Sequence, residues 1–186
     1  MIPIGVQLSS EKDGKRLLEK IVMEAKTFCR ADAGTLYAVS QEKQQLEFVI
    51  VRNDTCDIAQ GGTTKNDVTF APLPLQSDEL DYEAIATQVA LNGNSSNIAD
   101  HGKPSTIIAE YQIKSMLTIP LKNSADQVLG VLQLINSLDS DSNEVIPFDQ
   151  NLQQMMESFS SLAVAALEAY IREQSLRQEI KKTTTD

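Results

Sequence analysis

The sequence has few of the residues from which metal and redox sites are built. Its 186 residues include one histidine, two cysteines and no tryptophan. A zinc site of the usual type would use Cys29, Cys56 and His101 and still lack a fourth ligand, so we expect no metal site. The two cysteines form no spacing motif, which favours two free thiols in a reducing cytoplasm, with a disulfide as the alternative.

Long apolar runs and an excess of basic charge are also absent. The first ten residues, MIPIGVQLSS, contain no basic residue and no long apolar run, so they do not resemble a signal peptide. No stretch approaches the roughly 18 consecutive apolar residues of a membrane span. The net charge of −10 opposes binding to a nucleic-acid backbone or an anionic lipid surface. We therefore expect a cytoplasmic protein without nucleic-acid or membrane partners.

The length and the apolar content indicate a folded unit. Apolar residues make up 41% of the chain, which is too much for a disordered protein. The length suits one domain with extended ends. A chain of this size buries enough surface to fold without a disulfide or a metal.

Local patterns predict the elements of the first half. Apolar residues recur at helical spacing over 11–30, and Asp32-Ala33-Gly34 is expected to end that helix. Residues 35–40 and 46–52 are β-branched and aromatic, as in a strand hairpin. Residues 53–80 are rich in Gly, Pro and Asn and are predicted to be irregular.

Local patterns also predict helices, strands and loops in the second half. A helix is predicted over 81–92, ended by Asn92-Gly93, followed by a short strand at 97–99. Residues 100–113 are predicted to be a loop with a turn or two of helix at 107–111.

The clearest strand pair follows, at 114–122 and 127–136. The second strand is apolar on both faces, which predicts that both faces are covered. Pro120 cannot donate to a ladder, so we expect it at an edge position or a bulge. A single long helix is predicted from 149 to about 182. This order predicts an α+β fold with an antiparallel sheet.

Four segments together resemble the GAF domain family. They are CRADAGTLYAV (29–39), ALNGNSSNIAD (90–100), SMLTIPLKN (115–123) and VLGVLQLIN (128–136), and the resemblance covers about residues 10–172. It implies a central antiparallel sheet with the N- and C-terminal helices on one face and pocket loops on the other.

Two further segments narrow the resemblance. FVIVRND (48–54) and FAPLPL (70–75) look like the GAF subgroup found beside HD-type phosphohydrolase, cyclase and kinase outputs in bacterial signalling proteins. The resemblance thus implies a sensor domain over 1–172, a helical connector with a frayed tail over 173–186, and an output domain in the full-length protein.

The resemblance implies a non-catalytic regulatory module that binds a small molecule, mediates dimerisation, or does both. A ligandless structural dimerisation module is one alternative, and a cyclic-nucleotide-binding GAF domain is the other. The family's nucleotide-binding motif runs Asn-Lys, a spacer, Phe, three residues and Asp-Glu. Asn136 and Phe148 match it, but Ser137 replaces the lysine, and Leu152 and Gln153 replace the acids. We interpret Asn136 as a strand-end turn residue and Phe148 as a core anchor.

Neither a bound pigment nor catalysis is expected. Tetrapyrrole-binding relatives attach the pigment through a cysteine that is usually followed by histidine, whereas Cys56 is followed by Asp57. Other relatives reduce free methionine sulfoxide with paired cysteines. Here Cys29 falls on the core helix, which leaves Cys56 without a resolving partner. We therefore name no catalytic residue and no cofactor.

Candidate ligand residues come from the segment between the short strand and the first strand of the clear pair. Hydrogen-bonding side chains are expected there together with one adaptable apolar wall. The candidates are Asn97, Asp100, Tyr111, Ser115, Met116 and Thr118. The alternative for each is a packing or capping role. Residues 53–100 carry one basic residue against eight acids, so an anionic ligand would enter a negative environment.

The terminal helices are expected to form a homodimer. The apolar stripe of the last helix is wider than packing on the sheet alone requires. Small residues along this helix would allow a partner helix to approach closely. We expect Leu18 of the first helix and Met155, Leu162 and Ala169 of the last helix to contact a second chain.

Overall fold

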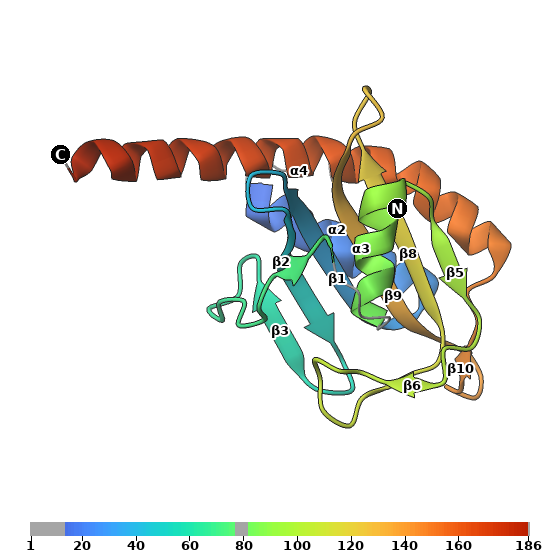
Figure 1. Ribbon diagram of the computed structural model, residues 1–186. Coiled ribbons are helices and arrows are strands. Elements are labelled where there is room, and N and C mark those ends of the chain that lie inside the picture. Colours follow the sequence, from blue (N-terminus) through green and yellow to red (C-terminus); the bar gives the residue numbers. More distant parts are fainter. Residues whose placement is uncertain (1–13, 77–81, 186) are drawn as a thin grey trace, which may run out of the picture.

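The computed structural model describes residues 14–76 and 82–185 (Figure 1). These residues form helices α2 (Gly14–Cys29), α3 (Tyr82–Asn92) and α4 (Gln150–Thr184). The strands are β1 (Ala31–Ser40), β2 (Gln45–Asn53), β3 (Ile58–Gly61), β4 (Leu73–Pro74), β5 (Ser96–Ile98), β6 (Lys103–Pro104), β7 (Gln112–Ile113), β8 (Met116–Lys122), β9 (Val128–Leu138) and β10 (Val145–Ile146). None of the helices in these two ranges is both long and apolar enough to cross a bilayer.

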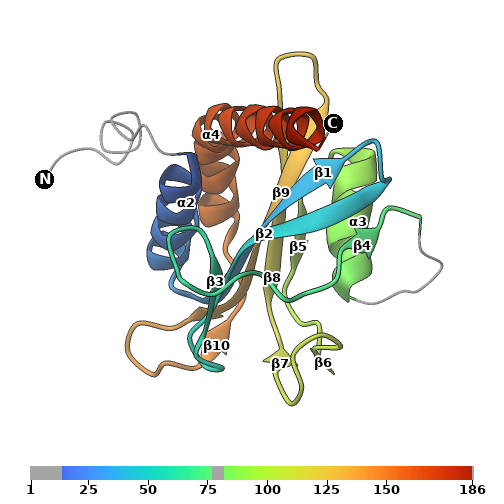
Figure 2. The ribbon, with the colours of Figure 1, turned by 90° about the vertical axis from the view of Figure 1, so that its left-hand side faces the viewer.

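The main sheet is antiparallel, and helices cover its two faces. Its strand order is β3-β2-β1-β9-β8-β5, with β10 beside β9 and β4 beside β2, and β6 and β7 form a separate pair. Figure 2 shows α2 and α4 on one side of the sheet and α3 on the other. We call the first side the helix face and the second the pocket face. The predicted α+β arrangement, with the terminal helices together, is confirmed.

Alternation along the central strands explains both layers. Leu36, Leu132 and Ile119 point to the helix face and pack with α2 and α4. Tyr37 and Val131 point to the pocket face and pack with α3. Because β1 and β9 lie in the middle of the sheet, both of their faces are buried, which confirms the prediction from the doubly apolar strand.

Pro120 of β8 stands opposite Val131 of β9 on one side of the strand only. Strand β5 pairs with β8 only from Met116 to Thr118, so among the described residues the side of β8 away from β9 has no strand partner at Pro120. The missing N–H of the proline therefore costs no ladder hydrogen bond there. The predicted edge position is confirmed.

The first helix ends earlier than predicted. It stops at Cys29, Arg30 has a φ of 50°, and β1 begins at Ala31. Asp32-Ala33-Gly34 thus lies within the strand instead of breaking the helix. Small residues are needed there because α2 packs directly on β1: a Cβ added at Gly34 would lie 2.8 Å from Lys26 Cγ.

Two other predictions are corrected. The segment 53–80, as far as Gln76, contains β3 and β4, both of which pair with β2, and residues 77–80 lie outside the described part. Residues 107–111 form a turn between β6 and β7 instead of a helical segment. Strands β3 and β4 form because each pairs with β2. They are too short to show the alternation of apolar and polar residues by which a strand is predicted.

The last helix is continuous, as predicted. The side chain of Asp149 caps it by accepting from the backbone N–H of Leu152 at 2.8 Å. Its first part packs on the sheet through the buried residues Met156, Ala163 and Leu167. Its end protrudes beyond the sheet (Figure 1), and residues 175–185 are exposed.

Gly130 allows the close contact between α4 and the sheet. A Cβ at this position of β9 would overlap the backbone carbonyl oxygen of Tyr37 and the Leu167 side chain. We expect Gly130→Ala to destabilise the fold by about 1–3 kcal/mol, because neither the strand backbone nor the packed helix can move away freely. Urea denaturation measures the difference.

Gly14→Ala is the matched control, because the added methyl would meet its neighbours at 3.7 Å, an ordinary contact distance. Its stability should stay unchanged or rise slightly. Equal stability of Gly130→Ala and the wild type would show that α4 does not pack on β9 as described.

Candidate ligand pocket

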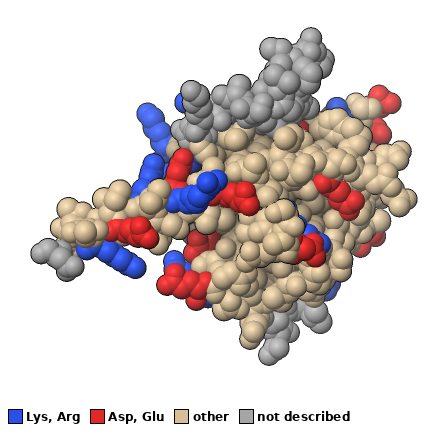
Figure 3. All heavy atoms as spheres, turned by 90° about the horizontal axis from the view of Figure 1, so that it is seen from above, with Lys and Arg blue, Asp and Glu red and all other residues tan. Residues whose placement is uncertain are grey.

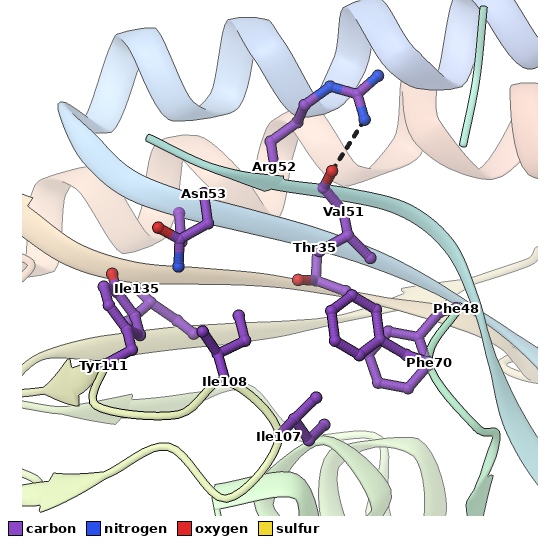
Figure 4. Close-up of a pocket in the computed structure, with 11 residues that line it drawn as sticks. Thr35, Phe48, Val51, Arg52, Asn53, Phe70, Ile107, Ile108, Tyr111 and Ile135 are labelled. Carbon is purple, nitrogen blue, oxygen red and sulfur yellow. Dashed lines mark hydrogen bonds between the residues drawn. The ribbon is translucent and has the colours of Figure 1, made fainter. Parts of the chain in front are cut away.

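A small cavity lies between the pocket face of the sheet and the turn that joins β6 to β7 (Figure 4). Its volume of about 20 Å³ has room for about one water molecule. Its lining residues are Ala33, Thr35, Phe48, Val51, Arg52, Asn53, Phe70, Ile107, Ile108, Tyr111 and Ile135. Apolar side chains therefore form most of the wall.

Aromatic rings close one end of the cavity. The ring centroids of Phe48 and Phe70 are 5.4 Å apart, and those of Phe48 and Tyr37 are 4.7 Å apart. Ile107 and Ile108 cover the cavity from the turn (Figure 4). This turn is held by Ser105, whose Oγ accepts from the backbone N–H groups of both isoleucines at 3.2 and 2.9 Å.

A polar cluster around Asp32 holds Tyr111, one of the residues that line the cavity. The hydroxyl of Tyr111 donates to Asp32 Oδ2 at 2.7 Å, and the hydroxyl of Thr55 donates to Asp32 Oδ1 at 2.9 Å. Burial and the hydrogen bond to Asp32 raise the pKa of the Tyr111 phenol well above its usual value. Tyr111 is therefore a neutral donor at any physiological pH.

Asn136 fastens the segment that carries Tyr111. Its φ is 58°, and its Oδ1 accepts from the backbone N–H groups of Lys114 and Ser115 at 2.8 and 3.2 Å. Its Nδ2 donates to Tyr111 Oη at 3.1 Å and to the carbonyl oxygen of Gln112 at 2.8 Å. The interpretation of Asn136 as a strand-end turn residue is wrong, because β9 continues through Asn136 to Leu138. Phe148 is 3% exposed in the core, so its assignment as a core anchor is confirmed.

The one cation among the lining residues is directed away from the cavity. Arg52 Nη2 lies 2.9 Å from Glu19 Oε1 on α2, and Nη1 donates to the carbonyl oxygens of Val51 and Gln60 at 2.9 and 2.7 Å. Figure 4 shows its side chain on the helix side of β2. Arg52 therefore holds α2, β2 and β3 together and offers the cavity no charge.

Three of the predicted ligand residues lie on the pocket face. Tyr111 lines the cavity. Met116 and Thr118 are fully buried on the same face but do not line it. Instead, Gln133 Nε2 donates to Thr118 Oγ1 at 3.1 Å and to Met116 Sδ at 3.0 Å, while Gln133 Oε1 accepts from Tyr37 Oη at 3.2 Å.

The other three predicted ligand residues do not line this cavity. Asn97 lies on the helix face, where its Nδ2 donates to the carbonyl oxygen of Phe148 at 2.9 Å. Ser115 is buried and donates to the carbonyl oxygen of Ile146 at 2.7 Å, which ties β10 to the sheet. Asp100 is exposed and does not line the cavity. Neighbouring residues of a strand point to opposite faces of the sheet. Asn97 therefore points to the helix face, whereas the next residue, Ile98, points to the pocket face.

Sequence reasoning missed the cavity residues of β2. Tyr37 pairs with Phe48 and Ala33 pairs with Asn53, which puts Phe48 and Asn53 on the pocket face although they are an odd number of residues apart. A bulge opposite Leu36 and Tyr37 supplies the extra residue. Simple alternation would have placed the two side chains on opposite faces.

We expect Tyr111→Phe to lower the free energy of unfolding by about 1.5–3 kcal/mol, because it removes a buried hydrogen bond to a carboxylate. Tyr170→Phe is the control: that ring also packs against the core, but no hydrogen bond of its hydroxyl to a described residue is found. Chemical denaturation of both variants tests this. Equal effects would mean that the Asp32 hydrogen bond adds nothing.

Comparisons with known proteins agree with this architecture. The sequence profile of the GAF domain matches residues 13–167. The dual 3',5'-cyclic-AMP and -GMP phosphodiesterase 11A of Takifugu rubripes is 36% identical over 89 residues, which are 45% of this chain and 9% of that protein. The matched part of the chain therefore corresponds to a small part of that relative.

Solved structures share the fold at low sequence identity. The GAF domain of a phosphoenolpyruvate-protein phosphotransferase from Coxiella burnetii has a TM-score of 0.68 and 16% identity, covering 93% of this chain and 92% of that one. The free methionine-R-sulfoxide reductase of Neisseria meningitidis has a TM-score of 0.61 and 15% identity, covering 91% and 87%. With the profile match, they lead to one conclusion: the chain belongs to the GAF domain family, a family of regulatory and sensory modules.

Proposed function

We propose that this chain is a non-catalytic regulatory module of a bacterial signalling protein. In this proposal it forms a homodimer through α2 and α4, senses a small molecule at the cavity, and controls an output attached beyond α4. The observation that carries the proposal is a series of apolar residues along α4 that the other described residues leave wholly or partly exposed.

The series repeats every seven residues. Its members are Met155, Leu162, Ala169 and Leu176. Met155 is 49% exposed, Leu162 38% and Leu176 59%, while Ala169 is half-buried. A seven-residue apolar repeat is typical of helices that pair along their length. The series runs from the part of α4 on the sheet into the protruding end, so a partner helix could follow it throughout.

The apolar surface continues onto α2. A groove of about 140 Å³ runs between α2 and α4 and is lined by Glu24, Ala25, Phe28, Met155, Met156 and Phe159. Met23 and Phe28 of α2 are also exposed. The expectation for Leu18 is wrong, because this side chain is fully buried in the core and cannot reach a partner. Phe28 and Met23 take its place in the proposed interface.

Charge supports a second copy of this chain as the partner. The protruding end of α4 carries basic and acidic side chains side by side (Figure 3). Arg172 and Glu173 are adjacent, and Arg177 lies near Glu179. Because both signs are present on one helix, two identical helices can pair without accumulating like charge.

Hydrogen bonds connect the cavity to α2 and provide a route for a signal. Asp32 holds Tyr111 at the cavity and Thr55 in the turn after β2. The carbonyl oxygen of Asp32 also accepts from the backbone N–H of Asp54 at 3.0 Å, and Asp54 forms an ion pair with Lys26 of α2. A movement of the Tyr111 segment would therefore pull on α2 through two contacts.

The cysteines favour a non-catalytic role. Burial and the Asp149 carboxylate raise the pKa of the Cys29 thiol to about 12. Burial and the Asp32 carboxylate raise the pKa of Cys56 above its usual value. The thiolate is the reactive form, so neither residue is poised for the sulfoxide reduction named for the Neisseria structure.

Cyclic-nucleotide binding has less support. The Takifugu rubripes relative favours it, since its name refers to cyclic AMP and cyclic GMP. However, Arg52 is committed to Glu19, and the substituted motif positions have structural roles. Ser137 Oγ donates to the carbonyl oxygen of Cys29 at 2.8 Å, and Gln153 accepts from Asn97 at 3.2 Å.

We expect Leu162→Glu to convert a dimer into a monomer with an unchanged fold, because it puts charge into the proposed interface at an exposed position. Leu91→Glu is the control: Leu91 is equally apolar and 61% exposed, but it lies on α3. Sedimentation velocity at tens of micromolar gives the masses. A monomeric wild-type chain would contradict the dimer.

The thiols provide a separate test of the non-catalytic role. At pH 7.5 Cys56 of the folded chain should react with iodoacetamide more slowly than glutathione does, since its thiolate is disfavoured. Mass spectrometry follows the reaction, and the urea-unfolded chain gives the unperturbed rate. A rate above that of glutathione would indicate an activated cysteine and a catalytic role.

A further inference from the structure

The cavity contains a hydrogen-bond donor that the described residues leave unpaired. Asn53 is 2% exposed, and its Oδ1 accepts from the backbone N–H of Cys56 at 2.9 Å. That hydrogen bond sets the orientation of the amide, because a flipped group would place two N–H donors face to face. No acceptor among the described residues lies within hydrogen-bond distance of Asn53 Nδ2.

The unpaired donor faces the cavity. Figure 4 shows the amide nitrogen of Asn53 on the side of Ile108 and Tyr111. Thr35, the next polar lining residue, lies on the neighbouring strand of the same sheet face. A buried donor without a partner costs stability, so a residue of this kind at a cavity indicates a partner that the described residues do not supply.

The surroundings disfavour a charged partner. Arg52 binds Glu19 on the helix face, so no lining residue offers a counter-charge to an anion. The carboxylate of Asp32 already accepts from Tyr111 and Thr55 and would repel a second negative group. A cation is disfavoured at Asn53 because the group presented there is an N–H donor. The acceptor must therefore belong to an uncharged molecule.

The shape of the wall favours a flat ring. Phe48 and Phe70 present their rings at one end, with an interplanar angle of 36°. Ile107 and Ile108 form the cover and are only half-buried. Because they lie on a short turn and not in the sheet, they are the lining residues that can move aside when a larger molecule enters.

We infer that the cavity binds an uncharged, planar aromatic compound that carries an oxygen or nitrogen acceptor. Asn53 Nδ2 donates to this acceptor, and the ring packs against Phe48 and Phe70 while Ile107 and Ile108 move outward. This inference rests on the sensing part of the proposed function and names the class of ligand.

Benzamide, toluene and benzoate form a matched set of probes, because they share the ring and differ in the acceptor and the charge. In ¹H–¹⁵N spectra of the full chain, benzamide should move the side-chain amide protons of Asn53 downfield. Toluene, which has no acceptor, should not cause this downfield shift, and benzoate should bind at least about tenfold more weakly than benzamide. The Asn53 signals are assigned by triple-resonance experiments on the wild-type chain.

Asn53→Leu removes the donor at nearly constant size and should weaken benzamide binding about tenfold while leaving toluene binding unchanged. Asn94→Leu, at an exposed asparagine, is the control and should bind as the wild type does. If Asn53→Leu does not fold because it also loses the Cys56 hydrogen bond, the probe series on the wild-type chain still decides the question.

Two results with a bound probe would overturn the inference: benzoate binds as tightly as benzamide, or benzamide leaves the Asn53 amide signals unshifted. It is also overturned if no probe binds and water is the only partner of Asn53 Nδ2. The first result, or binding of an unrelated compound in a wider screen, would leave the sensing function standing. No binding by any compound, with an intact dimer in sedimentation, would leave only the structural dimerisation role.

Discussion

The structure depends on the double burial of its central strands. Strands β1 and β9 pair with each other and with β2 and β8, so neither can turn a face to water. Their apolar side chains point both ways, and each face requires a cover. The helix face receives a continuous cover from α2 and α4. Gly34 and Gly130 permit this cover, because at both positions a side chain would meet the packed helix.

The pocket face has a different kind of cover, which explains why the cavity is there. Apart from α3, it is covered by short strands and turns that carry little regular hydrogen bonding of their own. Side chains replace that bonding: Asn136, Asp32 and Ser105 hold the segment from the turn to β8. Short segments that are each held by a few side-chain hydrogen bonds can open locally at a lower free-energy cost than a packed helix can. Sensing and dimerisation thus fall on opposite faces of one sheet.

Two features connect these faces. The turn after β2 contacts Asp32, which binds Tyr111 of the cavity wall, and it also contacts Lys26 on α2. The protruding end of α4 continues the apolar series that starts on the sheet. A change at the cavity therefore has a short physical path to the helices, and the helices have a direct path to whatever follows them.

The sequence by itself determined the elements whose signal is local. The helical spacing of α2 and α4, the doubly apolar β9 and the edge position of Pro120 all follow from neighbouring residues. Only the tertiary structure decided the site. A bulge in β2 put Phe48 and Asn53 on one face, a strand register sent Asn97 to the other, and long-range pairing created β3. Each of these three features depends on which strand lies alongside. The alternation of apolar and polar residues in the sequence does not reveal a one-residue shift, although such a shift moves every later side chain of the strand to the opposite face.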